Sequence, residues 1–186
     1  MLHHSSFIGI DQALANSGLA LYSEQDQSIF VSCLRTNSKD QVGDRLSQIE
    51  TYLKDLIEIL DKPKIFYEYV YSGKFVPYES IKVLGLVEKI IAEYKLSSEC
   101  FRSNAKEKGS WRSILEVSNQ KKDLQTKLNL QGKFNHNISD AIGILGAGLV
   151  TDGIISLESI YKLEIKNLTH VKQGSSKSVL QCIRNL

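Results

Sequence analysis

Cysteine and proline are scarce in this chain, which argues against cysteine-based sites and against frequent interruption of helices and strands. The three cysteines, Cys33, Cys100 and Cys182, lie far apart and are odd in number. They form no CxxC pair, so they suggest neither a zinc site nor a disulfide framework, and a reducing intracellular compartment is the simpler expectation. Only two prolines occur among 186 residues. Because proline interrupts regular elements, most of the chain is free to form helices and strands.

Long apolar runs are also missing. No stretch approaches the roughly 20 apolar residues that a membrane-spanning helix needs, so we expect no membrane partner. Residues 1–6 show no charged segment followed by an apolar run, and no secretory signal is expected there. We expect these residues to form a disordered lead. The length suits one domain with a sizeable core.

The chain has little excess charge of either sign, with a formal net charge of +2. The net charge therefore does not by itself indicate a nucleic-acid-binding protein. The distribution is more informative, because residues 102–133 hold eight basic and three acidic side chains, an excess of five. From charge alone, a solvated helical face is the simpler interpretation of this segment.

The apolar pattern of the first hundred residues predicts a sheet with two helices. Short apolar runs separated by turn residues predict three strands in an antiparallel meander, and a three- to four-residue spacing of apolar side chains predicts helices. The predicted strands are residues 7–10, 18–22, 29–34, 64–70 and 98–101, and the predicted helices are residues 40–60 and 78–94.

Helices dominate the rest of the predicted domain. We expect short basic helices at residues 106–115 and 119–130, and a strongly apolar helix at residues 136–152. An α/β domain would then span residues 7–152, with a mixed five-stranded sheet flanked by helices. Residues 153–186 would be a C-terminal extension of the same domain, helical in part around residues 157–163.

Three carboxylates occur where core residues are expected. Asp11 closes an apolar strand, Glu68 lies within another, and Asp140 lies in the first turns of the apolar helix. A buried ionised carboxylate is costly unless it is paired or bound to a metal. Each could separately be a cap or half of an ion pair, but three on different elements favour a shared explanation.

The segments around these acids resemble the motifs of RuvC-type Holliday junction resolvases, in order and with fitting spacing. Residues 7–18, FIGIDQALANSG, are similar to the opening strand of that family, which reads roughly GIDPGxxxTG. Residues 65–70, IFYEYV, resemble its strand with a central glutamate, and residues 136–144, HNISDAIGI, resemble its last helix. Ser110-Trp111-Arg112 is similar to the basic stretch before that helix, notably in phage-type members. The likeness covers residues 7 to about 150, and the ordered set is more specific than any one motif.

This resemblance implies a ribonuclease H-like fold with three antiparallel strands followed by two parallel ones. It implies an endonuclease that resolves four-way DNA junctions by paired nicking, as a homodimer, in the cytoplasm of a bacterial or phage-infected cell. It also implies two Mg²⁺ ions, replaceable by Mn²⁺, held by Asp11, Glu68 and Asp140. Such ions suit hard oxygen ligands and phosphodiester hydrolysis.

The chain departs from the family pattern at two places. An acid or histidine usually lies three residues before the last aspartate, and here that residue is Asn137, with His136 one step earlier. Asn137 could offer a carbonyl oxygen to a metal but could not act as a base, and His136 is the alternative catalytic residue. The usual proline and glycine after the first aspartate are Gln12 and Ala13.

Several basic side chains are candidates for contacts with DNA phosphates, which position a nuclease without reading sequence. They are Lys106, Lys108, Arg112, Lys121 and Lys122. Lys74 and Phe75 follow the Glu68 strand and could reach a junction, where an aromatic side chain can wedge between base pairs. Local packing of Phe75 is the competing interpretation, and Trp111 is expected to anchor the core rather than stack on a base.

Two other functions fit the same residues. The Asn137 departure is compatible with a non-catalytic protein that binds branched DNA, and the fold is compatible with a nuclease acting on RNA or hybrids. For the expected homodimer, the helix at residues 78–94 contains Gly85 and apolar residues that could form a two-fold interface. Packing of that helix on the chain's own sheet would explain most of the same pattern.

Overall fold

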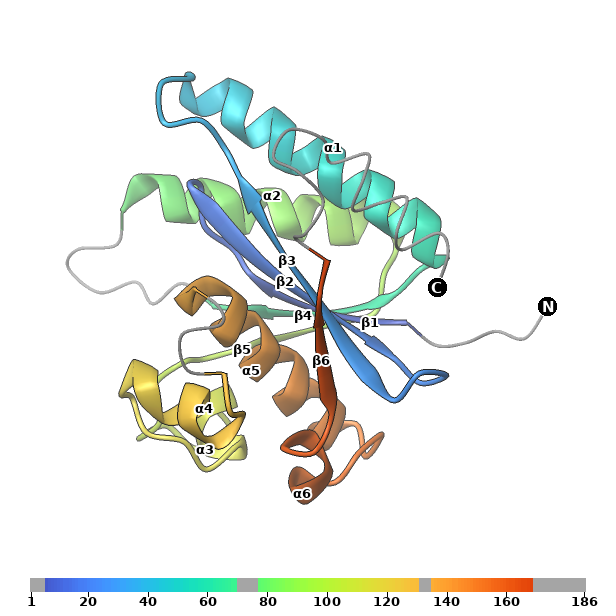
Figure 1. Cartoon of the computed structure of the whole chain (residues 1–186). Coiled ribbons are helices and arrows are strands. Elements are labelled where there is room, and N and C mark those ends of the chain that lie inside the picture. Colours follow the sequence, from blue (N-terminus) through green and yellow to red (C-terminus); the bar gives the residue numbers. More distant parts are fainter. Residues whose placement is uncertain (1–5, 70–76, 131–134, 169–186) are drawn as a thin grey trace.

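The computed structural model describes residues 6–69, 77–130 and 135–168, which form a mixed sheet covered by helices (Figure 1). Within these residues the sheet has six strands in the order β5-β4-β1-β2-β3-β6. The strands are β1 (Phe7–Asp11), β2 (Asn16–Ser23), β3 (Ser28–Arg35), β4 (Lys64–Glu68), β5 (Ser98–Phe101) and β6 (Glu164–Asn167). The candidate DNA-contacting residues Lys74 and Phe75 lie outside the described residues.

The predicted five-stranded arrangement is confirmed, with one strand added. β1, β2 and β3 pair antiparallel, and β4 and β5 continue the sheet in parallel from β1. The addition is β6, which pairs parallel with β3 at the opposite edge. Its sequence, EIKN, has a single apolar residue and only four positions, so no alternating pattern marks it as a strand.

Helices cover both faces of the sheet. Figure 1 shows α1 and α2 on one side and α5 on the other. The helices among the described residues are α1 (Val42–Leu60), α2 (Tyr78–Tyr94), α3 (Trp111–Ile114), α4 (Lys121–Lys127), α5 (His136–Thr151) and α6 (Leu157–Ile160). None of them combines the length and apolar character needed to cross a bilayer.

The short helices are shorter than the pattern predicts. α3 begins at Trp111 rather than near Lys106, because Ser110 caps it by accepting a hydrogen bond from the Ser113 N–H at 3.1 Å. Gly109 immediately before the cap has a φ of +79°, a conformation that ends any helix coming from residue 106. The helix expected at residues 157–163 is limited to α6, and the chain then turns into β6.

Alternation along the strands gives the sheet two cores. In β1, Ile8 and Ile10 pack toward α1 and α2, whereas Phe7 lies in the core beneath α5. In β4, Ile65 belongs to the first core and Phe66 to the second. Successive strand residues point to opposite faces, so the residues at the ends of β1 and β4 can be assigned to a face by counting from Phe7 and Phe66.

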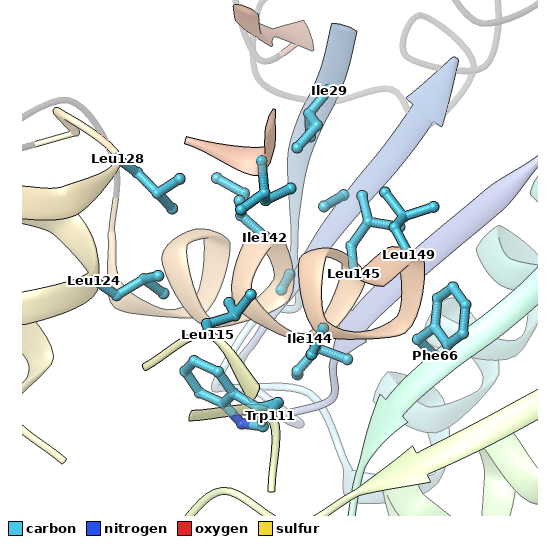
Figure 2. Packing of buried hydrophobic residues seen from close by; sticks show 14 of the residues in the cluster. Ile29, Phe66, Trp111, Leu115, Leu124, Leu128, Ile142, Ile144, Leu145 and Leu149 are labelled. Carbon is cyan, nitrogen blue, oxygen red and sulfur yellow. The ribbon is translucent and has the colours of Figure 1, made fainter. Parts of the chain in front are cut away.

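α5 is buried along almost its whole length and lies very close to the sheet. A Cβ added to Gly9 of β1 would lie 2.4 Å from the Ala141 backbone oxygen, and one added to Gly148 would lie 2.4 Å from the Phe66 ring. On its other side α5 contacts α3 and α4, where Trp111 and Leu124 are fully buried (Figure 2). Trp111 is thus the core anchor that was predicted. The buried side chain of Ile160 ties the described part of the C-terminal extension to this core.

Candidate active site

Asp11 and Glu68 lie side by side at the ends of two parallel strands. The β1–β4 register runs from Phe7 opposite Lys64 to Ile10 opposite Tyr67, so Asp11 and Glu68 are the next residues on each strand. Counting by twos from Phe7 and from Phe66 puts both carboxylates on the α5 face. Parallel strands therefore bring together two acids that are 57 positions apart in the chain.

The first turns of α5 bring the third acid to the same place. Asp11 pairs with Gly18 of β2, and a Cβ on Gly18 would lie 2.0 Å from the Asn137 backbone oxygen. Only glycine lets the helix start rest directly on this strand pair. Asn135 caps α5 by accepting from the Ile138 N–H at 2.9 Å. Asn137 and Asp140, three residues apart, then share one face of the helix.

The pKa of Asp11 depends on its burial and on the two other acids. Burial raises its pKa well above the ordinary value, and the carboxylates of Asp140 and Glu68 raise it further. A hydrogen bond from the Asn137 amide and the charge of Arg112 act in the opposite direction. The site therefore concentrates negative charge that its own residues only partly neutralise.

Glu68 is held through both its side chain and its backbone. The indole Nε1–H of Trp111 donates to Glu68 Oε2 at 2.9 Å. The Gln12 side chain donates to the Glu68 backbone carbonyl and accepts from the Glu68 N–H. Burial raises the pKa of Glu68, whereas the hydrogen bond from Trp111 and one from Ser103 lower it.

Asp140 is paired with a buried arginine. Arg112 Nη2 lies 3.2 Å from Asp140 Oδ1, and the arginine side chain is 8% exposed. The guanidinium stacks on the neighbouring Trp111 ring, with 4.0 Å from Cζ to the ring centroid. It also donates to the Ser118 carbonyl at 3.4 Å. Two adjacent residues of α3 thus contact two of the three acids.

The other candidate residues lie in different surroundings. His136 is exposed on the first turn of α5, whereas Asn137 is buried against Asp11. Lys106, Lys108 and Lys122 are exposed around α3 and α4. The side chain of Lys121 lies outside the described part. Arg112, predicted as a surface phosphate contact, is instead placed inside the site.

Whether these residues suit a metal ion depends on their chemistry and on how they are gathered. Three carboxylates and an amide oxygen are the hard donors that Mg²⁺ prefers. Within residues 6–69, 77–130 and 135–168, however, no three His, Cys, Asp or Glu side chains are close enough together to hold an ion. Trp111 holds one carboxylate and Arg112 another. The donor set therefore fits Mg²⁺ in kind, whereas the described acids are not gathered closely enough to hold an ion without a shift of their side chains.

Sequence reasoning missed three polar partners of the acids. Gln12 registered only as a departure from a family motif, and the links from Trp111 to Glu68 and from Arg112 to Asp140 were not foreseen. One signal was present, because a buried tryptophan normally needs an acceptor for its N–H. A tryptophan expected in the core near three buried acids could have been assigned to one of them.

Comparisons with known proteins give a fold but no close relative. No protein-family description matches the sequence, and neither does any curated protein. Thermus thermophilus RuvC in complex with a Holliday junction substrate superposes with a TM-score of 0.60 at 15% identity, covering 81% of this chain and 97% of RuvC. A second Thermus thermophilus RuvC structure gives 0.59 at 14% identity, covering 80% and 96%. A fowlpox virus resolvase with its Holliday junction reaches 0.42 at 13% identity, covering 78% and 97%.

The fold class is thereby established. The chain has the α/β ribonuclease H-like fold in the form found in RuvC, as its three sequence motifs predict. The superposition spans nearly the full length of RuvC.

Proposed function

We propose that this protein is a metal-dependent endonuclease that cuts branched DNA, with the four-way junction as its main substrate. The observation that carries the proposal is that Asp11 and Glu68 end neighbouring strands on the face that α5 covers, with Asp140 of α5 near enough to raise the pKa of both. Their mutual influence on the pKa of Asp11 supports a shared role. The fold shared with RuvC, a protein solved with a Holliday junction, supports the choice of substrate.

The residues of the site have distinct roles in this proposal. Asp11, Glu68 and Asp140 would hold Mg²⁺ or Mn²⁺, two ions per site. Asn137 would add its amide oxygen, since its N–H donates to Asp11. When bound, the ions would activate a water and stabilise the leaving oxygen of the phosphodiester. His136 remains a candidate proton carrier at the rim, because it is exposed one residue before Asn137.

DNA would approach from the side of α3 and α4. The exposed Lys106, Lys108 and Lys122 would contact backbone phosphates, and such contacts position a duplex without reading its sequence. Lys121, Lys74 and Phe75 remain candidates from the sequence. Arg112 is too buried for a surface contact; its proposed role is to orient Asp140 and to offset the charge of the site.

Paired nicking requires two sites, which a symmetric dimer would present to a two-fold junction. α2 offers an exposed apolar surface for such contact, since Tyr78 is 68% and Ile81 50% exposed. Two nicks on opposing strands, together with a dimer in sedimentation, would support this part of the proposal. A single nick from a monomer would contradict it.

The test is cleavage of a synthetic four-way junction in Mg²⁺, mapped at nucleotide resolution, by wild type and by the Asp11→Asn and Glu68→Gln variants. We expect either variant to lower the rate at least 1,000-fold, roughly 4 kcal/mol of transition-state stabilisation. Equal cleavage by wild type and Asp11→Asn would contradict the proposal. Duplex and RNA–DNA hybrid substrates in the same assay separate a junction enzyme from a nuclease for hybrids.

A second function is favoured by one observation. The Arg112–Asp140 pair gives a candidate metal ligand a protein cation as its partner, which suits a protein that binds branched DNA without cutting it. Metal-independent junction binding with no cleavage in Mg²⁺ or Mn²⁺ would select this alternative. Cleavage that is lost in Glu68→Gln would exclude it.

A further inference from the structure

Gln12 lies between the two candidate ligands Asp11 and Glu68 and is buried, with 7% of its surface exposed. It directly follows Asp11 in the chain, and both polar atoms of its side chain bond to the backbone of Glu68. A buried carboxamide normally has such partners. The choice of partner is informative here, because both bonds go to one residue on a neighbouring strand.

The geometry of the sheet explains why Glu68 needs these bonds. Along a strand, successive residues direct their N–H and C=O groups to opposite neighbours. The Tyr69 N–H donates to the Phe101 carbonyl at 2.7 Å, toward β5. The backbone groups of Glu68 therefore face β1, whose paired register with β4 ends one residue earlier, at Ile10 and Tyr67.

The carboxamide of Gln12 fills the place that a peptide group of β1 would otherwise take. Its nitrogen donates to the Glu68 carbonyl and its oxygen accepts from the Glu68 N–H at 3.3 Å. A carboxamide has the same donor and acceptor as a peptide group. The ladder is thus extended by a side chain, while the main chain of β1 is free to turn away after Asp11.

We propose that Gln12 is a positioning residue that fixes Glu68 relative to Asp11 for metal binding. The inference rests on the proposed nuclease function, since it assigns Gln12 a part in the same site. One residue that bonds to Glu68 and is covalently joined to Asp11 limits how far the two carboxylates can move apart. Trp111 holds the carboxylate of Glu68, and Gln12 holds its backbone.

The test compares Gln12→Met with wild type. Methionine has nearly the same length and volume but cannot form either bond. We expect faster hydrogen exchange at the Glu68 amide, measured by NMR without metal, and a 10- to 100-fold higher Mg²⁺ concentration for half-maximal junction cleavage. The KM for the junction should stay at the wild-type value, because Gln12 is buried and its side chain is bonded to the Glu68 backbone.

Gln125→Met serves as the matched control. It is the same substitution and removes a side-chain hydrogen bond elsewhere, from the Gln125 amide to the Ser139 hydroxyl at 3.1 Å. It should leave both the Glu68 exchange rate and the Mg²⁺ requirement at wild-type values. Gln12→Glu is the second variant, because it retains an acceptor for the Glu68 N–H but loses the donor to the carbonyl. If Gln12→Met does not fold, the exchange rate of the Glu68 amide in Gln12→Glu decides the question, because the added carboxylate by itself changes the affinity of the site for Mg²⁺.

Wild-type exchange and a wild-type Mg²⁺ requirement in a folded Gln12 variant would overturn the proposal. So would equal effects in Gln125→Met, which would indicate a general loss of stability. The exchange measurement does not depend on cleavage. If the wild-type protein fails to cut junctions but Gln12→Met still accelerates exchange at Glu68, the nuclease proposal fails while the backbone contact stands.

Discussion

The two faces of the sheet are built differently. The face beneath α1 and α2 is filled by ordinary aliphatic and aromatic side chains, and its ion pairs lie on the surface between helices, as between Lys54 and Glu93 at 2.9 Å. The α5 face has helix and sheet in near-backbone contact at Gly9, Gly18 and Gly148. Close contact leaves little freedom for the groups at the start of α5, which is where the candidate ligands Asn137 and Asp140 lie.

Buried polar residues follow the same division. Ser110 and Arg112 beside α5, and Asn137 and Ser139 within it, are buried. The buried polar side chains of β2 and β3 are serines, Ser17, Ser28 and Ser32, and Ser32 contacts Tyr52 Oη at 3.2 Å. A buried polar group is costly without a partner, so the buried arginine and asparagine near the three acids indicate that the α5 face is the one that holds charged side chains in place.

The largest expected effect comes from filling the closest contact. Gly18→Ala would place a Cβ 2.3 Å from the Asn137 carbonyl carbon, so the start of α5 must shift. We expect the free energy of unfolding to fall by about 3 kcal/mol, the upper range for overpacking, and junction cleavage to be lost with it. Urea unfolding and the cleavage assay measure both. A stable, fully active Gly18→Ala protein would show that the contact is not tight.

An intermediate effect is expected from the charge of Asp11. Its pKa in the folded protein lies above the ordinary value of 3.8, so the folded state binds the proton more tightly than the unfolded state. The free energy of unfolding should therefore decrease as the pH rises from about 4 through the raised pKa. Asp11→Asn abolishes this loss.

At pH 7 in EDTA, Asp11→Asn should be more stable than wild type by about 1–3 kcal/mol, the scale of an uncompensated buried polar group. At pH 4 the difference should shrink toward zero. Urea unfolding of both proteins at the two pH values measures it. A difference that does not change with pH would mean that Asp11 is not the group responsible.

The smallest effect uses the same substitution on the other face. Gly43 lies exposed in the first turn of α1, and a Cβ there would have no atom within 4 Å. Gly43→Ala should raise the free energy of unfolding by about 0.5 kcal/mol, through lower entropy of the unfolded chain. Thermal unfolding next to Gly18→Ala gives the direct comparison. A large loss of stability in Gly43→Ala would remove the distinction between the faces.

Much of the fold could be predicted from the sequence because buried apolar side chains occur in recognisable runs and spacings along the chain. The short apolar runs of β1 to β3 and the helical spacing in α1 and α2 are direct consequences of which side chains face the core. The acids at positions 11, 68 and 140 were detectable for a related reason, since each interrupts an apolar pattern. β6 shows no such pattern, because a short edge strand can form from polar residues when a partner strand is available.

The partners of the acids were harder to predict because they depend on three-dimensional placement. Arg112 carries the same sequence signal as the exposed lysines around it, and only the fold shows that it turns inward to Asp140. Gln12 has no charge, no periodicity and no motif of its own. Its two bonds exist because the pairing of β1 with β4 ends at Tyr67, one residue before Glu68. Strand register of this kind is not visible in the linear sequence.

The two outer strands of the sheet restrict how the protein can associate. β5 and β6 have four residues each, so neither edge gives an incoming strand more than a few main-chain partners. An exposed long edge is a template for adding a strand from another chain, and the described part of this sheet has none. Association of two copies through helix surfaces instead would keep each sheet, and the acids at its strand ends, intact within its own subunit.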